Sequence, residues 1–152
     1  MSKEAEARAL YNTLCHTLDS MNWRYDKPDE LAIHTIARGV NMPIKLVIRI
    51  DADNQVMYLK SPMPFAIPAS LRDVLGKAVN IANFSMLNGS FEYDYSDGYL
   101  AFRMVVPYMD SIISEAVCKY MIILSCSMTD RFNDKFKALA EGRMTLNEFE
   151  TL

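Results

Sequence analysis

Glycine is scarce in this chain: it has five among 152 residues, and no two lie close enough together to form a phosphate-binding loop. Basic residues are not in excess, since 16 Lys and Arg stand against 19 Asp and Glu and leave a net charge of −3. A nucleic-acid-binding domain needs a basic patch or stripe, which this balance does not supply. Long apolar runs are also missing, because the most apolar segment, 120–128, is far shorter than the ~20 residues of a membrane span. These absences argue against nucleotide-loop, nucleic-acid-binding and membrane-spanning functions.

Cysteine is too sparse for a disulfide framework. Cys118 and Cys126 lie on one expected helix, about 12 Å apart along its axis, whereas a disulfide needs Cα atoms within about 7 Å. Cys15 stands alone, and all three thiols have apolar neighbours, where a thiol is usually unreactive. An odd number of cysteines is typical of a reducing compartment, and the first residues show no signal peptide. We therefore expect a cytoplasmic protein.

The residue patterns of metal and catalytic sites are absent too. His16 and His34 lie on different elements without metal-ligand spacing, so we expect no metal and no other cofactor. Segment 51–55 begins like a calcium loop, but Val56 and Pro62 stand where such a loop needs glycine and glutamate. A hairpin turn explains its polar residues better. The sequence therefore predicts no catalytic residue and a protein that is not an enzyme.

Composition and periodicity predict one α+β domain over residues 1–152. With 51% hydrophobic and 23% charged residues the chain is globular. An apolar stripe predicts a helix over residues 2–21, and alternation then predicts four short strands, the first two at 23–25 and 31–38. A helix capped by Ser70, two strands and two helices follow. Strands joined by tight hairpins indicate an antiparallel sheet with helices at the N-terminus, middle and C-terminus. The core is expected to span 2–141, and the tail 143–152 to be either a last helical turn or disordered.

Two hairpins allow a test of register. With Asp53-Asn54 as a two-residue loop, Ile48 faces Leu59 and the apolar residues of both strands share one side. With Asp97-Gly98 as the second loop, Tyr93 faces Phe102 and Phe91 faces Met104, again on one side. Glu92 then lies opposite Arg103 on the other side. That arrangement favours a cross-strand ion pair over an acid–base pair formed by Glu92 and Asp94.

The C-terminal part is expected to contain two helices. Asp110 or Ser111 is expected to cap the first one, and Thr129-Asp130 a second, shorter one that ends at Glu141-Gly142. The first helix has a wide apolar face that we expect to be buried, formed by Ile112, Ile113, Ala116, Val117, Tyr120, Ile123 and Leu124.

The outer face of the sheet is the candidate binding surface. Tyr and Arg are the residue types that dominate interface energetics, and an Arg49–Tyr58 cation–π contact is one expected feature of this face. By the registers above, the face carries Val47, Arg49, Tyr58, Lys60, Tyr99 and Arg103.

Three segments resemble the YbjN family of bacterial proteins. They are Asn80–Phe84, Asn88–Asp94 and Asp97–Arg103, and the downstream helices with Glu141–Thr145 fit the same pattern, so the resemblance covers residues 20–148. The resemblance implies the fold of type III secretion chaperones, a homodimer, and a role described as regulation of sensory transduction. It implies no catalytic residue.

Two hypotheses follow. The first is a non-enzymatic protein-binding module of chaperone-like or regulatory character, whose partner is a protein and which forms a homodimer. The alternative is a small-ligand sensor or enzyme with a pocket between helix and sheet, under segment 62–68.

Overall fold

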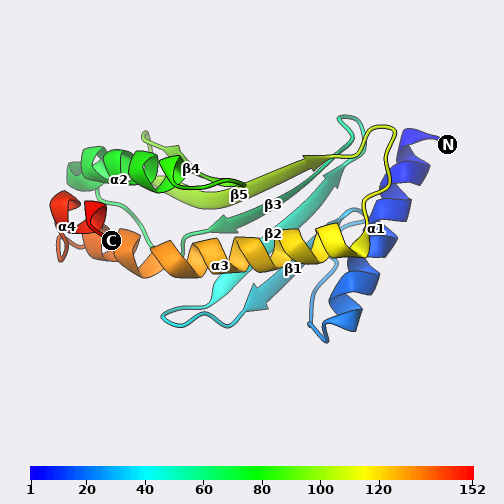
Figure 1. The fold of residues 1–152 in the computed structure, drawn as a ribbon, viewed down its shortest axis with the longest axis horizontal. Coiled ribbons are helices and arrows are strands. Elements are labelled where there is room, and N and C mark those ends of the chain that lie inside the picture. Colours follow the sequence, from blue (N-terminus) through cyan, green and yellow to red (C-terminus); the bar gives the residue numbers. More distant parts are fainter.

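Five antiparallel strands form the centre of the protein in the computed structural model, which describes residues 1–152 (Figure 1). The strands lie in the order β1-β2-β3-β5-β4. The expected α+β fold with an antiparallel sheet is confirmed. In chain order the elements are α1 (Lys3–Ser20), β1 (Ala32–Ala37), β2 (Ile44–Asp51), β3 (Val56–Pro62), a 3₁₀ turn (Ala69–Leu71), α2 (Arg72–Phe84), β4 (Ser90–Asp94), β5 (Tyr99–Pro107), α3 (Glu115–Ala140) and α4 (Leu146–Glu150).

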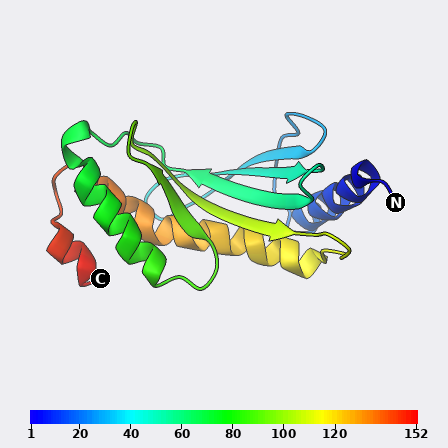
Figure 2. The same cartoon turned by 90° about the horizontal axis from the view of Figure 1, so that it is seen from above.

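The helices gather on one side of the sheet. The long helix α3 runs along the inner face and contacts β2, β3 and β5, while α1 packs against α3 and β2 at one end. At the other end α2 contacts β4, α3 and α4. Figure 2 shows that no helix lies over the middle of the opposite face. We call the covered side the inner face and the open side the outer face.

The β2–β3 hairpin has the predicted register, with Ile48 opposite Leu59. Its turn differs from the prediction, because the loop contains four residues, 52–55, and the positive φ falls on Gln55 rather than on the two central residues. The Asp51 carboxylate accepts hydrogen bonds from the backbone N–H and side-chain amide of Asn54, at 3.0 and 2.7 Å. These bonds close the wider turn without the conformation of a two-residue loop.

The β4–β5 hairpin is shifted by two residues from its predicted register. Phe91 lies opposite Phe102, and Glu92 lies opposite Ala101 rather than Arg103. The loop again has four residues, 95–98, and Gly98 at its end has a φ of +79°. An even shift keeps every side chain on its predicted face. The burial of Phe91 and Phe102 therefore agrees with the sequence prediction.

Several local predictions were wrong. Residues 23–25 do not form a strand, since that segment meets β1 through the single bridge Asp26–His34. Ser70 does not cap α2, which continues from the 3₁₀ turn without a side-chain cap. The cap of α3 is Ser114, whose hydroxyl accepts a hydrogen bond from the Val117 N–H.

The C-terminal helices also differ from the prediction. No helix begins at Thr129-Asp130, because α3 continues through it, with Thr129 buried and the Asp130 carboxylate accepting from the Val40 N–H at 2.8 Å. The tail is ordered: a capping box at Thr145 and Glu148 starts α4, and Phe149 stacks on Phe136 with ring centroids 5.5 Å apart.

Candidate functional site

The outer face carries all six residues that the sequence assigned to it. Val47 lies opposite Lys60, Lys60 opposite Arg103, and Arg49 opposite Tyr58. Tyr99 lies on β5 beside the edge strand β4 and is 40% exposed. The structure therefore brings these side chains onto one continuous surface.

Three cations of the outer face, Arg49, Lys60 and Arg103, are paired within the chain. Glu92 accepts from Lys60 at 3.0 Å, from Arg103 at 3.2 Å and from the Tyr99 hydroxyl at 3.3 Å. Burial and the neighbouring Glu92 carboxylate both raise the pKa of Tyr99. Arg49 pairs with Asp29 at 2.9 Å. Each of these three cations is thus already paired in the isolated chain, and Lys60 and Arg103 share the single negative charge of Glu92.

One expected contact of the outer face is replaced by another. The cation over the ring of Tyr58 is Lys60, at 5.8 Å from the centroid. Arg49 turns instead toward Asp29, because a carboxylate forms a charge-assisted hydrogen bond that a ring face cannot offer.

A second surface lies on α3, where the prediction of a buried face was wrong. Cys118, Met121 and Ile122 face the core, whereas the expected core residues lie largely outside it. The exposed fractions are 37% for Val117, 48% for Tyr120 and 44% for Ile123, and Ile112, which precedes the helix, is 95% exposed. The helix therefore has two apolar sides, and the sheet covers only one of them.

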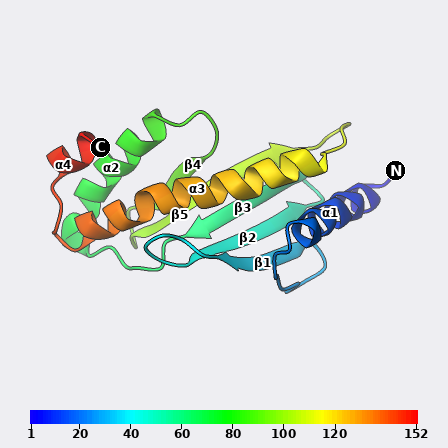
Figure 3. The same ribbon diagram turned by 60° about the horizontal axis from the view of Figure 1, so that its bottom comes forward.

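The last residue of α2 and the loop after it extend this exposed apolar side. Phe84 is 93% exposed and Leu87 is 96% exposed. The Asn88 amide donates to the Tyr120 hydroxyl at 2.8 Å, which fixes the loop beside α3 (Figure 3). Sequence reasoning did not assign this site. We define the α2–α3 surface by its five apolar residues, which are Phe84, Leu87, Val117, Tyr120 and Ile123.

A cavity of about 340 Å³ lies between α1 and the segment that joins β5 to α3. It is bordered by Glu6, Thr13 and Tyr108, far from the segment 62–68 under which a pocket was expected. The Tyr108 hydroxyl is buried and has no hydrogen-bond partner in the protein. Burial, Glu6 and Asp51 all raise the pKa of this hydroxyl.

The remaining side chains that could act as nucleophiles or bind a metal include the cysteines and histidines. All three cysteines are free, and burial raises the pKa of Cys118 and of Cys126 to about 11. A thiol with such a pKa is almost wholly protonated at neutral pH and is a poor nucleophile. His16 pairs with Glu115. No group of three or more His, Cys, Asp or Glu side chains is placed to hold a metal ion, and none of the helices has the length and apolarity needed to cross a membrane.

Comparison with solved structures finds a similar fold in YbjN from E. coli, which has been suggested to regulate transcription. The structures match with a TM-score of 0.61 over 86% of this chain and 92% of that chain, at 13% sequence identity. No protein-family model matches the sequence, and no curated protein matches it. The YbjN-like fold expected from the sequence is confirmed.

Proposed function

We propose that this chain is a non-enzymatic protein-binding module of chaperone-like or regulatory character that forms a homodimer in the cytoplasm. The observation that carries the proposal is the α2–α3 surface. Phe84 and Leu87 are almost fully exposed, and the adjoining apolar stripe of α3 is between a third and a half exposed. Three free cysteines support the cytoplasmic assignment.

The size of the α2–α3 surface supports a protein partner. Its five residues expose on the order of 600 Å², the upper end of what a monomer usually leaves uncovered. Phe84 and Leu87, which are almost fully exposed, would each contribute about 1.5–3 kcal/mol on complete burial, and the half-exposed residues of α3 would contribute less. Two copies that pair this surface about a twofold axis would bury on the order of 1,200 Å², the lower limit of a standard-size interface.

We expect sedimentation equilibrium at micromolar concentration to give twice the chain mass of 17.3 kDa. Leu87→Asp should give a monomer with unchanged circular dichroism, because the side chain is exposed and its charge would be buried at the interface. Val105→Glu is the matched control, since Val105 is half-exposed on the outer face. A monomeric wild type contradicts the homodimer, and a dimer that only Val105→Glu disrupts places the interface on the outer face.

The cavity beside α1 favours a second candidate function, that of a small-ligand sensor. It is lined by both apolar and acidic residues and by a tyrosine whose buried hydroxyl lacks a protein partner. A thermal-shift screen of metabolites and nucleotides tests this candidate. A ligand that binds there should raise the melting temperature by several degrees, and Thr13→Trp, which fills the cavity, should abolish the shift.

A further inference from the structure

The free edge of β1 is only partly covered. His34 exchanges two backbone hydrogen bonds with Asp26 on the side away from β2, at 2.8 and 2.9 Å. Because bonding alternates along an antiparallel strand, the N–H and C=O of Ile36 point the same way. Neither has a backbone partner outside the sheet. The nearby Arg24 carbonyl accepts instead from the Thr35 hydroxyl, at 2.7 Å.

Two hollows flank this uncovered edge, one on each face of the sheet. The hollow on the outer side, of about 410 Å³, is bordered by His34, Ile36 and Lys45. The hollow on the inner side, of about 500 Å³, is bordered by Trp23, Ala37 and also by Cys126 of α3. A strand that pairs with Ile36 would point alternate side chains into the two hollows. The edge therefore has the shape that an added strand requires.

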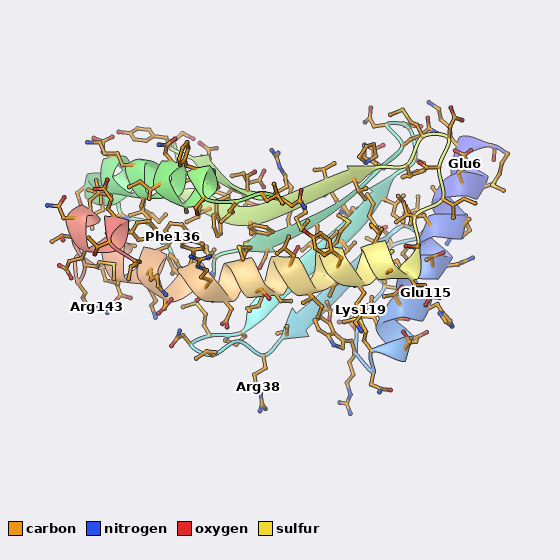
Figure 4. The ribbon with its side chains drawn as sticks, viewed as in Figure 1. Glu6, Arg38, Glu115, Lys119, Phe136 and Arg143 are labelled. Atoms are coloured by element: carbon orange, nitrogen blue, oxygen red, sulfur yellow. The ribbon has the colours of Figure 1, made fainter.

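The charge around this edge is positive although the protein is acidic. Arg24, Arg38 and Lys45 form no ion pair. Against these three cations stand Asp26 at the outer hollow and Asp130, which accepts from the Val40 N–H. Figure 4 shows Arg38 pointing away from the body of the protein. A second copy paired edge to edge would bring these cations together, which is how lysine protects natural edge strands. An acidic segment would neutralise them.

We propose that the free edge of β1 binds an extended acidic segment of another protein by strand addition at Ile36. In that segment acidic side chains alternate with apolar ones. The acidic side chains lie over Lys45 at the outer hollow, and Arg38 at the end of β1 adds a second positive charge. The apolar side chains enter the inner hollow beside Trp23 and Ala37. This site lies apart from the α2–α3 surface and does not depend on the proposed homodimer.

The single tryptophan of the chain reports binding directly, because Trp23 borders the inner hollow. The probe is a short synthetic peptide that alternates valine with glutamate, and the control peptide has lysine in place of glutamate. We expect the acidic peptide to cause a saturable change in Trp23 fluorescence and the basic peptide to cause none. Arg38→Glu with Lys45→Glu should weaken binding of the acidic peptide by about tenfold or more.

Ile36→Pro tests the backbone contact itself. Proline removes the outward N–H without removing a bond to β2, so circular dichroism should be unchanged while peptide binding is lost. Ile36→Ala keeps the N–H and should retain most of the affinity. Equal binding of both peptides, no binding of the acidic one, or full binding by Ile36→Pro would each overturn the proposal.

Discussion

Phe102→Ala is expected to lower the free energy of unfolding by about 3–5 kcal/mol. The ring is fully buried on the inner face of β5 and meets Phe91 edge to face, with centroids 5.3 Å apart. Phe91 in turn meets Phe136 of α3 at 5.0 Å, so Phe102 belongs to the contact between the sheet and its covering helix. Alanine would leave a cavity that these rigid rings fill only in part. Urea denaturation followed by circular dichroism measures the loss.

Neighbouring residues on the outer face provide the control. Arg103→Ala is expected to cost less than about 1 kcal/mol, because its side chain is 45% exposed and its ion pair borders solvent. Glu92→Ala should cost more than Arg103→Ala but less than Phe102→Ala, because Glu92 accepts from three partners yet leaves no core cavity. Arg103 follows Phe102 directly in β5, so the comparison holds the strand constant and changes only the face. If either variant proved more harmful than Phe102→Ala, the assignment of inner and outer faces would be wrong.

The faces of the sheet could be predicted because side chains alternate along a strand with a fixed period of two. The exact partners could not, since Asp97-Gly98 can close either a two-residue or a four-residue loop. In the structure Gly98 takes the last position of a four-residue loop, and the Asp94 carboxylate accepts from the Ser96 N–H at 2.9 Å. Local hydrogen bonds of the turn, which periodicity does not describe, thus set the register.

The α2–α3 surface could be predicted only in part. An apolar stripe on a helix usually faces the core, so the stripe containing Val117, Tyr120 and Ile123 was assigned to it. The helix carries a second apolar side with Met121 and Ile122, and periodicity cannot show which of the two packs on the sheet. The adjoining loop residues have no period at all. Only the three-dimensional arrangement brings the loop and the helix together.

Gly89→Ala is expected to destabilise the protein by about 2–5 kcal/mol, through two separate causes. Gly89 has a φ of +75°, a conformation that costs an L-residue roughly 1–2 kcal/mol. A Cβ there would also lie 2.4 Å from Cζ of Phe102 and 3.0 Å from Cγ of Met104. Both side chains are buried, so neither can move without straining the core, which typically costs about 1–3 kcal/mol. Urea denaturation again supplies the measurement.

Two further variants separate these causes. Gly142 has a similar φ of +72°, but a Cβ at this position would have no atom within 4 Å, so Gly142→Ala should show the backbone cost alone. Phe102→Leu removes Cζ, so Gly89→Ala combined with Phe102→Leu should cost less than the two single changes added together. If Gly89→Ala were no worse than Gly142→Ala, the 85–89 loop would not rest on Phe102. The path of that loop exposes Leu87. If the loop followed a different path, the α2–α3 surface would lose its most exposed residue.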